Sequence, residues 1–135
     1  MKARIPAGMF LVSAASLMYE ISLARLLAIE LWHHYAFLII SCALLGYGAA
    51  GAFRLTWTGR IPLFLPVLSF SLLLIPLFLL SSQLPFDPAL MSLDPWHGGW
   101  LLLSFLLLAV PFFLAGLTLN LLLEQYTEHI HFLYA

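Results

Sequence analysis

Three ionisable residues, Glu20, Arg25 and Glu30, lie in an otherwise apolar N-terminal stretch, and the paired histidines His33 and His34 follow them. A carboxylate in such surroundings can bind a cation or relay a proton, a guanidinium can bind an anion, and an imidazole can ligate a metal. Charges at membrane depth are costly and usually face a partner, a cavity or a ligand. These five residues are therefore the candidates for a ligand-binding or polar cluster.

The spacing of these residues separates their roles. Ser13, Ser16 and Glu20 recur at i, i+3 and i+7, which places them on one stripe of a helix. Arg25 lies about 140° further around an ideal helix than Glu20, so the two do not pair. Glu20 must then meet a partner on another element or remain protonated. Two interpretations stay open, a structural polar contact and a site for a ligand, proton or ion.

The elements that position these residues are membrane helices. Of the 135 residues, 64% are hydrophobic and 8% are charged, whereas about 25% are charged in a typical soluble domain. A soluble domain of this size could not bury so much apolar surface. Stretches long enough to cross about 30 Å of hydrocarbon occur at residues 7–30, 34–53, 61–81 and 96–123. We therefore predict an all-α integral membrane protein, a single domain of four transmembrane helices.

Two connections can be placed between these helices. The chain has neither Gly nor Pro from Met9 to Leu45, and one continuous helix there would be about 55 Å long, so we predict a break at residues 32–35. Asp-Pro pairs occur at residues 87–88 and 94–95, and each pair suits a helix N-cap followed by the first helical residue. They predict a short interfacial helix between the third and fourth spans.

The basic residues set the orientation. Lys2, Arg4, Arg54 and Arg60 all fall on one side if the chain crosses the membrane an even number of times, and the loop on the other side, between the third and fourth spans, has no Lys or Arg. The positive-inside rule then predicts that both termini are cytoplasmic. The net charge of -1 gives no electrostatic footprint for nucleic acid.

Small residues in the second span predict close helix packing. Residues 46–51 match the dinucleotide-binding pattern G-x-G-x-x-G, but that pattern should open a helix after a strand, and here it closes an apolar helix. Cys42, Gly46 and Ala50 instead form a seam along which another helix can approach closely. In the fourth span, Asn120 and Glu124 share a face, and we expect Asn120 to form a hydrogen bond across helices.

Metal and cofactor sites are weaker candidates. Glu30 and His33 have the Glu-x-x-His spacing of di-iron helical bundles, but such a site needs two copies and further carboxylates. His34 and His97 could hold a haem between two imidazoles, yet each lies among aromatic residues at an expected membrane interface. We therefore predict no metal and no cofactor. The sequence contains no Ser-His-Asp set, phosphate-binding loop or Cys-His cluster, so we assign no catalytic residue.

The chain resembles the N-terminal membrane region of bacterial membrane-bound spermidine synthase-like proteins, relatives of the polyamine aminopropyltransferases. The shared features are a Tyr-Glu…Arg element at Tyr19, Glu20 and Arg25, a Trp-x-His-x-Ala-Phe turn at residues 32–37, and a Leu-Leu-Gly-x-Gly-Ala-x-Gly ending at residues 44–51. The resemblance is tightest over these segments and looser in the proline-rich middle of the chain.

This resemblance implies a membrane module and not a catalyst. Family members continue into a soluble domain of Rossmann-like methyltransferase fold that binds decarboxylated S-adenosylmethionine and a polyamine, and residues 1–135 contain no counterpart of it. The resemblance implies the bacterial inner membrane, with a cationic amine near Glu20 or Glu30 as the natural ligand. The chain could be part of a longer, aminopropyltransferase-like enzyme or a small standalone relative. The alternative is an accessory or assembly subunit packed in a larger membrane complex, and a haem- or quinone-binding subunit is a weaker third candidate.

Overall fold

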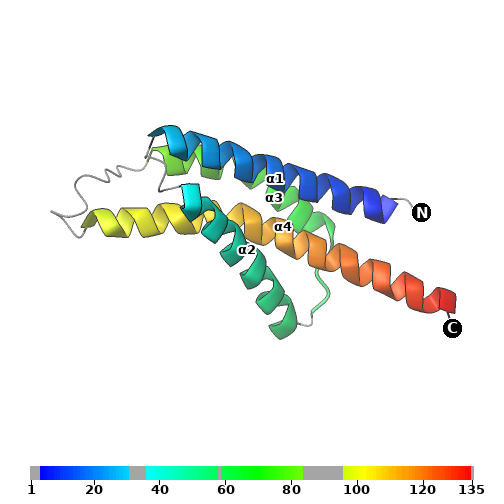
Figure 1. The fold of residues 1–135 in the computed structure, drawn as a ribbon. Coiled ribbons are helices and arrows are strands. Elements are labelled where there is room, and N and C mark those ends of the chain that lie inside the picture. The colour runs from blue at the N-terminus through cyan, green and yellow to red at the C-terminus, as the bar shows by residue number, and fades with distance from the viewer. Residues whose placement is uncertain (1–3, 31–35, 58, 84–95, 135) are drawn as a thin grey trace.

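The computed structural model describes residues 4–30, 36–57, 59–83 and 96–134, which fold almost entirely into helices. The four helices are α1 (Arg4–Glu30), α2 (Ala36–Thr56), α3 (Phe64–Ser82) and α4 (Trp96–Tyr134), and the described residues contain no strand (Figure 1). The predicted all-α architecture is confirmed.

Local sequence explains where the helices begin and end. The backbone N–H of Trp57 donates to the carbonyl of Phe53 at 2.8 Å and closes the last turn of α2. The N–H of Leu65 donates to the carbonyl of Pro62 at 3.0 Å, so α3 begins just after a proline, which favours the start of a helix. Residues 31–35, where we predicted the break, and residues 84–95, where we predicted the interfacial helix, lie outside the described residues. The structure does show that α1 and α2 are separate helices.

Among the described residues, three helices have the length and hydropathy to cross a membrane, through the segments Ile5–Ala28, Phe37–Thr56 and Gly98–Gln125. The apolar part of α3, Phe64–Leu80, is shorter. These helices indicate a membrane protein, while a fourth crossing by α3 and the orientation stay predictions. The helix α4 continues to Tyr134, well beyond the end of the predicted span at residue 123, because nothing in the polar residues that follow breaks a helix.

The helix α4 is the centre of the bundle. It packs against each of the other three helices and makes its largest interface with α2, whereas α1 and α3 scarcely touch each other. Successive helices alternate in direction, so that α1 and α3 run the same way and the two chain ends lie at the same end of the bundle (Figure 1). The main core joins α1, α2 and α4 and comprises Tyr19, Leu23, Ile39, Cys42, Ala43, Leu108, Ala109 and Phe112.

Candidate functional site

Glu20 is a half-buried residue of α1. One turn earlier on the same stripe, the Ser16 side chain is 1% exposed, and its Oγ accepts a hydrogen bond from Tyr47 Oη of α2 at 2.7 Å. Ser16 Oγ donates in turn to the carbonyl of Ser13 at 3.1 Å. Within the described part of the chain, no side chain forms a hydrogen bond or ion pair with Glu20.

The stripe therefore divides into two functions. Ser16 takes part in helix packing through the bond from Tyr47, and a hydrogen bond between membrane helices contributes on average about 0.6 kcal/mol. The Glu20 carboxylate lies one turn beyond that bond on the same face of α1, because residues four apart share a helix face. An unpaired, half-buried carboxylate beside polar neighbours can bind a cation or carry a proton.

Of the other members of the predicted cluster, the structure describes the side chain of Arg25 alone, and it does not pair Arg25 with Glu20. Arg25 is exposed and has no hydrogen bond or ion pair with any described residue. Glu30 is the last residue of α1, and its side chain, together with His33 and His34, lies outside the residues whose side chains the structure describes.

The predicted small-residue seam lies against α4. Cys42 and Ala50 are fully buried, and Cys42 Sγ donates to the carbonyl of Phe105 at 3.5 Å. A Cβ atom added to Gly46 would lie 2.6 Å from Phe112 Cβ and 2.8 Å from the carbonyl oxygen of Ala109. At such distances the two backbones meet directly, which only glycine permits. Residues 46–51 lie inside α2 and follow helix, not strand, so they lack the context of a dinucleotide site.

The seam is reciprocal, because α4 contributes a glycine of its own. A Cβ atom on Gly116 would lie 2.9 Å from Tyr47 Cδ1 and 3.0 Å from Ala50 Cβ. The Tyr47 ring packs on Phe112 with ring centroids 6.1 Å apart. The residue that donates to Ser16 is therefore held by the α2–α4 seam.

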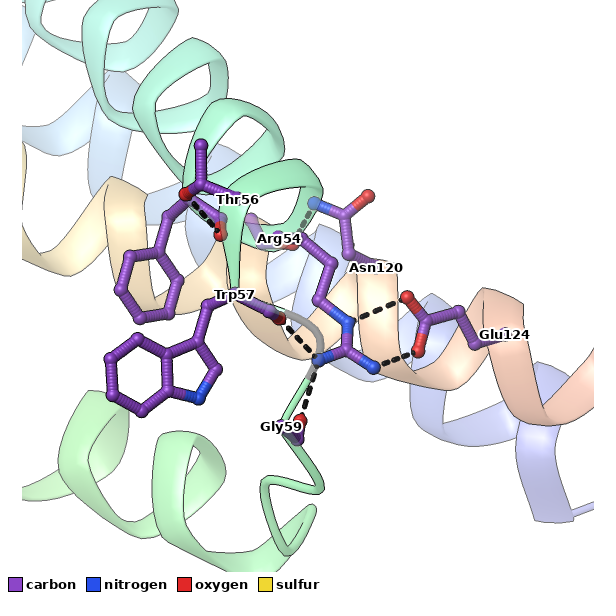
Figure 2. Close-up of polar contacts among 8 residues, drawn as sticks. Arg54, Thr56, Trp57, Gly59, Asn120 and Glu124 are labelled. Atoms are coloured by element: carbon purple, nitrogen blue, oxygen red, sulfur yellow. Dashed lines mark hydrogen bonds and ion pairs between the residues drawn. The ribbon is translucent and has the colours of Figure 1, made fainter.

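An ion pair that sequence reasoning missed closes one end of this seam (Figure 2). Arg54 of α2 donates from Nε to Glu124 Oε1 at 2.6 Å and from Nη2 to Oε2 at 2.7 Å. Its Nη1 donates to the carbonyls of Trp57 at 3.1 Å and Gly59 at 2.9 Å. Trp57 stacks on Phe53 with 11° between the ring planes. One guanidinium thus links α2 to α4 and to the carbonyls that follow α2. Its two bonds to Glu124 have the bidentate geometry that favours arginine.

The expectation that Asn120 bonds across helices was wrong. Its Nδ2 donates to the carbonyl of Gly116, four residues earlier in the same helix, at 3.0 Å. A local backbone acceptor satisfies the short amide side chain, and the longer Glu124 is the residue that reaches α2. Two features of the sequence were signals of the Arg54–Glu124 ion pair, namely the shared face of Asn120 and Glu124 and the presence of a basic residue, Arg54, near the end of the second span.

The Glu-x-x-His spacing occurs twice in the sequence, because Glu128 and His131 repeat it near the end of α4. The two copies lie on helices that run in opposite directions (Figure 1). Because Glu30 ends α1 and Glu128 lies near the end of α4, the two copies are at opposite ends of the bundle and do not form one site. Among the described residues there is no group of three or more His, Cys, Asp or Glu that could hold a metal.

One buried hydroxyl in the core has no partner. Among the described residues, Tyr19 Oη is the sole buried side-chain oxygen or nitrogen without a hydrogen bond, and the Tyr19 ring packs on Phe112 with centroids 5.5 Å apart. Tyr19 precedes Glu20 but faces the core formed with α2 and α4, so its hydroxyl and the carboxylate belong to different surroundings.

Comparisons with family models, curated proteins and solved structures found no match to this chain. The function of the chain therefore has to be inferred from its own residues and their contacts.

Proposed function

We propose that this chain is the membrane-embedded module of a spermidine synthase-like protein, which it anchors in the bacterial inner membrane without catalysing a reaction itself. The observation that carries the anchoring role is the exposure of large apolar side chains on every helix. Phe10 of α1 is 72% exposed, Leu44 of α2 69%, Leu72 of α3 70% and Leu102 of α4 59%. Soluble monomers do not surround themselves with apolar surface in this way, whereas lipid solvates it favourably.

The proposed topology has four crossings with both termini in the cytoplasm. The 19 residues of α3 are close to the roughly 20 that a helix needs to span the hydrocarbon. The basic residues Arg54 and Arg60 lie near the connection between α2 and α3, at the same end as Arg4, which agrees with the positive-inside rule. The Arg54–Glu124 pair would then lie at the cytoplasmic boundary.

The proposed ligand of the module is a cationic amine bound at Glu20. Its support is the half-buried carboxylate that no described residue neutralises, one turn along α1 from Ser16, whose Oγ accepts a hydrogen bond from Tyr47. An alkylammonium group has up to three hydrogens to donate, so it suits a carboxylate with hydroxyl groups on the same helix face.

Anchoring and topology are tested together. Membranes from cells that make the full chain should retain it after alkaline carbonate extraction. Reporter fusions at residue 59 and at the C-terminus should be active only as cytoplasmic markers, and a fusion within residues 84–95 only as an external marker. Release by carbonate would contradict anchoring, and an external C-terminus would contradict the fourth crossing.

Amine binding is tested by titrating spermidine into the detergent-solubilised chain. We expect Glu20→Gln to weaken binding at least about tenfold, since a charge-assisted contact in a partly buried site contributes roughly 1.5–3 kcal/mol. Glu128→Gln removes the same charge at the end of α4 and is the matched control, expected to leave binding unchanged. Equal affinities of the wild-type chain and Glu20→Gln would exclude Glu20 as the amine site.

A further inference from the structure

An apolar groove of about 420 Å³ separates α1 from α3. Its walls include Met18, Ser22 and Leu26 of α1, and Ile75 and Phe78 of α3. Its volume lies within the range of small-molecule sites. The groove exists because α1 and α3 each pack on α4 but scarcely on each other, and it opens on the apolar outer surface of the bundle.

A cationic residue of α1 lies next to the residues that line this groove. Ala15, Met18 and Ser22 line it at i, i+3 and i+7, and Arg25 is the next residue in the same progression, which places it on the same face of α1. Arg25 is exposed and forms no hydrogen bond or ion pair with a described residue. Ser22 Oγ is occupied by the carbonyl of Met18 at 2.7 Å, so Arg25 is the free polar group on this face.

The depth of the groove fits one end of a lipid. The helices α1 and α3 run in the same direction (Figure 1), and Leu26 and Phe78 each lie one turn before the end of their helix. The groove therefore extends from the middle of the two helices towards their C-terminal ends, the end of α1 that carries Arg25 and the matching end of α3. An arginine near a helix end can extend its guanidinium to the headgroup level.

We propose that this groove and Arg25 bind an anionic phospholipid, with an acyl chain between α1 and α3 and the phosphate on the guanidinium. Arginine matches phosphate geometry with two parallel N–H donors. A free phosphate would leave the apolar groove empty. A zwitterionic lipid such as phosphatidylcholine also carries a phosphate, but its own quaternary ammonium offsets that charge, so its attraction to the guanidinium is weaker. This site lies on the opposite side of α1 from Glu20, so it is distinct from the proposed amine site.

The test is native mass spectrometry of the full chain released from detergent micelles, titrated with phosphatidylglycerol and with phosphatidylcholine that carries the same acyl chains. We expect the wild-type chain to retain phosphatidylglycerol about fivefold better, which corresponds to about 1 kcal/mol per basic residue near the headgroups. Arg25→Gln should abolish this preference, and Ser22→Phe, which fills the groove, should lower retention of both lipids. Arg60→Gln is the matched control and should keep the preference.

Equal retention of the two lipids by the wild-type chain, or an unchanged preference in Arg25→Gln, would overturn the proposal. So would a lipid-free dimer, because it would show that a second copy covers the groove. The inference rests on the proposed membrane location, but the two fail differently. A chain that stays monomeric in water without detergent contradicts the membrane location, whereas a detergent-dependent chain without lipid preference contradicts only the lipid site.

Discussion

The α2–α4 interface and the α1–α3 groove show two ways in which apolar helices meet. At the first, Gly46 and Gly116 let the backbones touch, and Arg54 closes one end through Glu124. At the second, large side chains such as those of Met18 and Phe78 line both walls and leave an open groove. Lipid is as apolar as leucine, so hydrophobicity alone does not drive helices together in a membrane, and close packing and polar contacts decide which pairs associate.

The contrast also assigns different roles to the charged residues. Arg54 and Glu124 satisfy each other where the helices are tightly packed. Glu20 and Arg25 have no partner among the described residues and lie on the two sides of α1, the helix that packs less extensively on α4 than α2 does. Arg54 and Glu124 therefore stabilise the fold, whereas we propose that Glu20 and Arg25 bind ligands.

The largest expected effect is at the seam. Gly46→Leu places a side chain where Phe112 Cβ and the Ala109 carbonyl already lie within 2.8 Å of the new Cβ, so α2 and α4 must separate, at a cost of about 3 kcal/mol or more. Gly48→Leu, two residues away, meets nothing within 4 Å and should be neutral or slightly stabilising. Reversible unfolding in mixed micelles, followed by circular dichroism, compares the two. Equal losses would mean that the seam is not closed.

A smaller effect is expected at the end of the seam. Arg54→Gln removes both bonds to Glu124 and both bonds to the carbonyls that follow α2. We expect a lower melting temperature and faster proteolysis at residues 57–60. In a double-mutant cycle, Glu124→Gln should add less to Arg54→Gln than it costs alone, because the partner is already lost. Strict additivity would argue against the pair.

The smallest effect is expected in the core. Tyr19→Phe removes a buried hydroxyl that has no partner among the described residues and keeps the ring on Phe112. We expect it to be neutral or to stabilise the chain by up to about 1 kcal/mol, because an unsatisfied buried hydroxyl is unfavourable. The unfolding measurement used for Gly46→Leu also serves here. A clear loss of stability would mean that the hydroxyl does have a partner in the membrane.

Local sequence patterns predicted the helices but not the long-range contacts between them. Apolar runs between polar or proline-rich segments were sufficient to place four helices, and the four-residue spacing of Cys42, Gly46 and Ala50 identified one face of α2. The pairing of Arg54 with Glu124 joins residues 70 positions apart, so neither residue carries a local sign of the other. The α1–α3 groove depends on where α1 and α3 pack on α4. The periodicity of either helix alone does not predict these positions.

The contrast between a closed seam and an open groove is tested most directly in a bilayer. The full chain would be reconstituted with a phospholipid that carries a photoreactive diazirine within its acyl chain, irradiated, and mapped by mass spectrometry. We predict cross-links on the groove residues Met18, Ser22, Leu26 and Ile75, and none on Cys42, Gly46 or Phe112. Labelling of the seam, or a groove that lipid never labels, would contradict the distinction between the two regions.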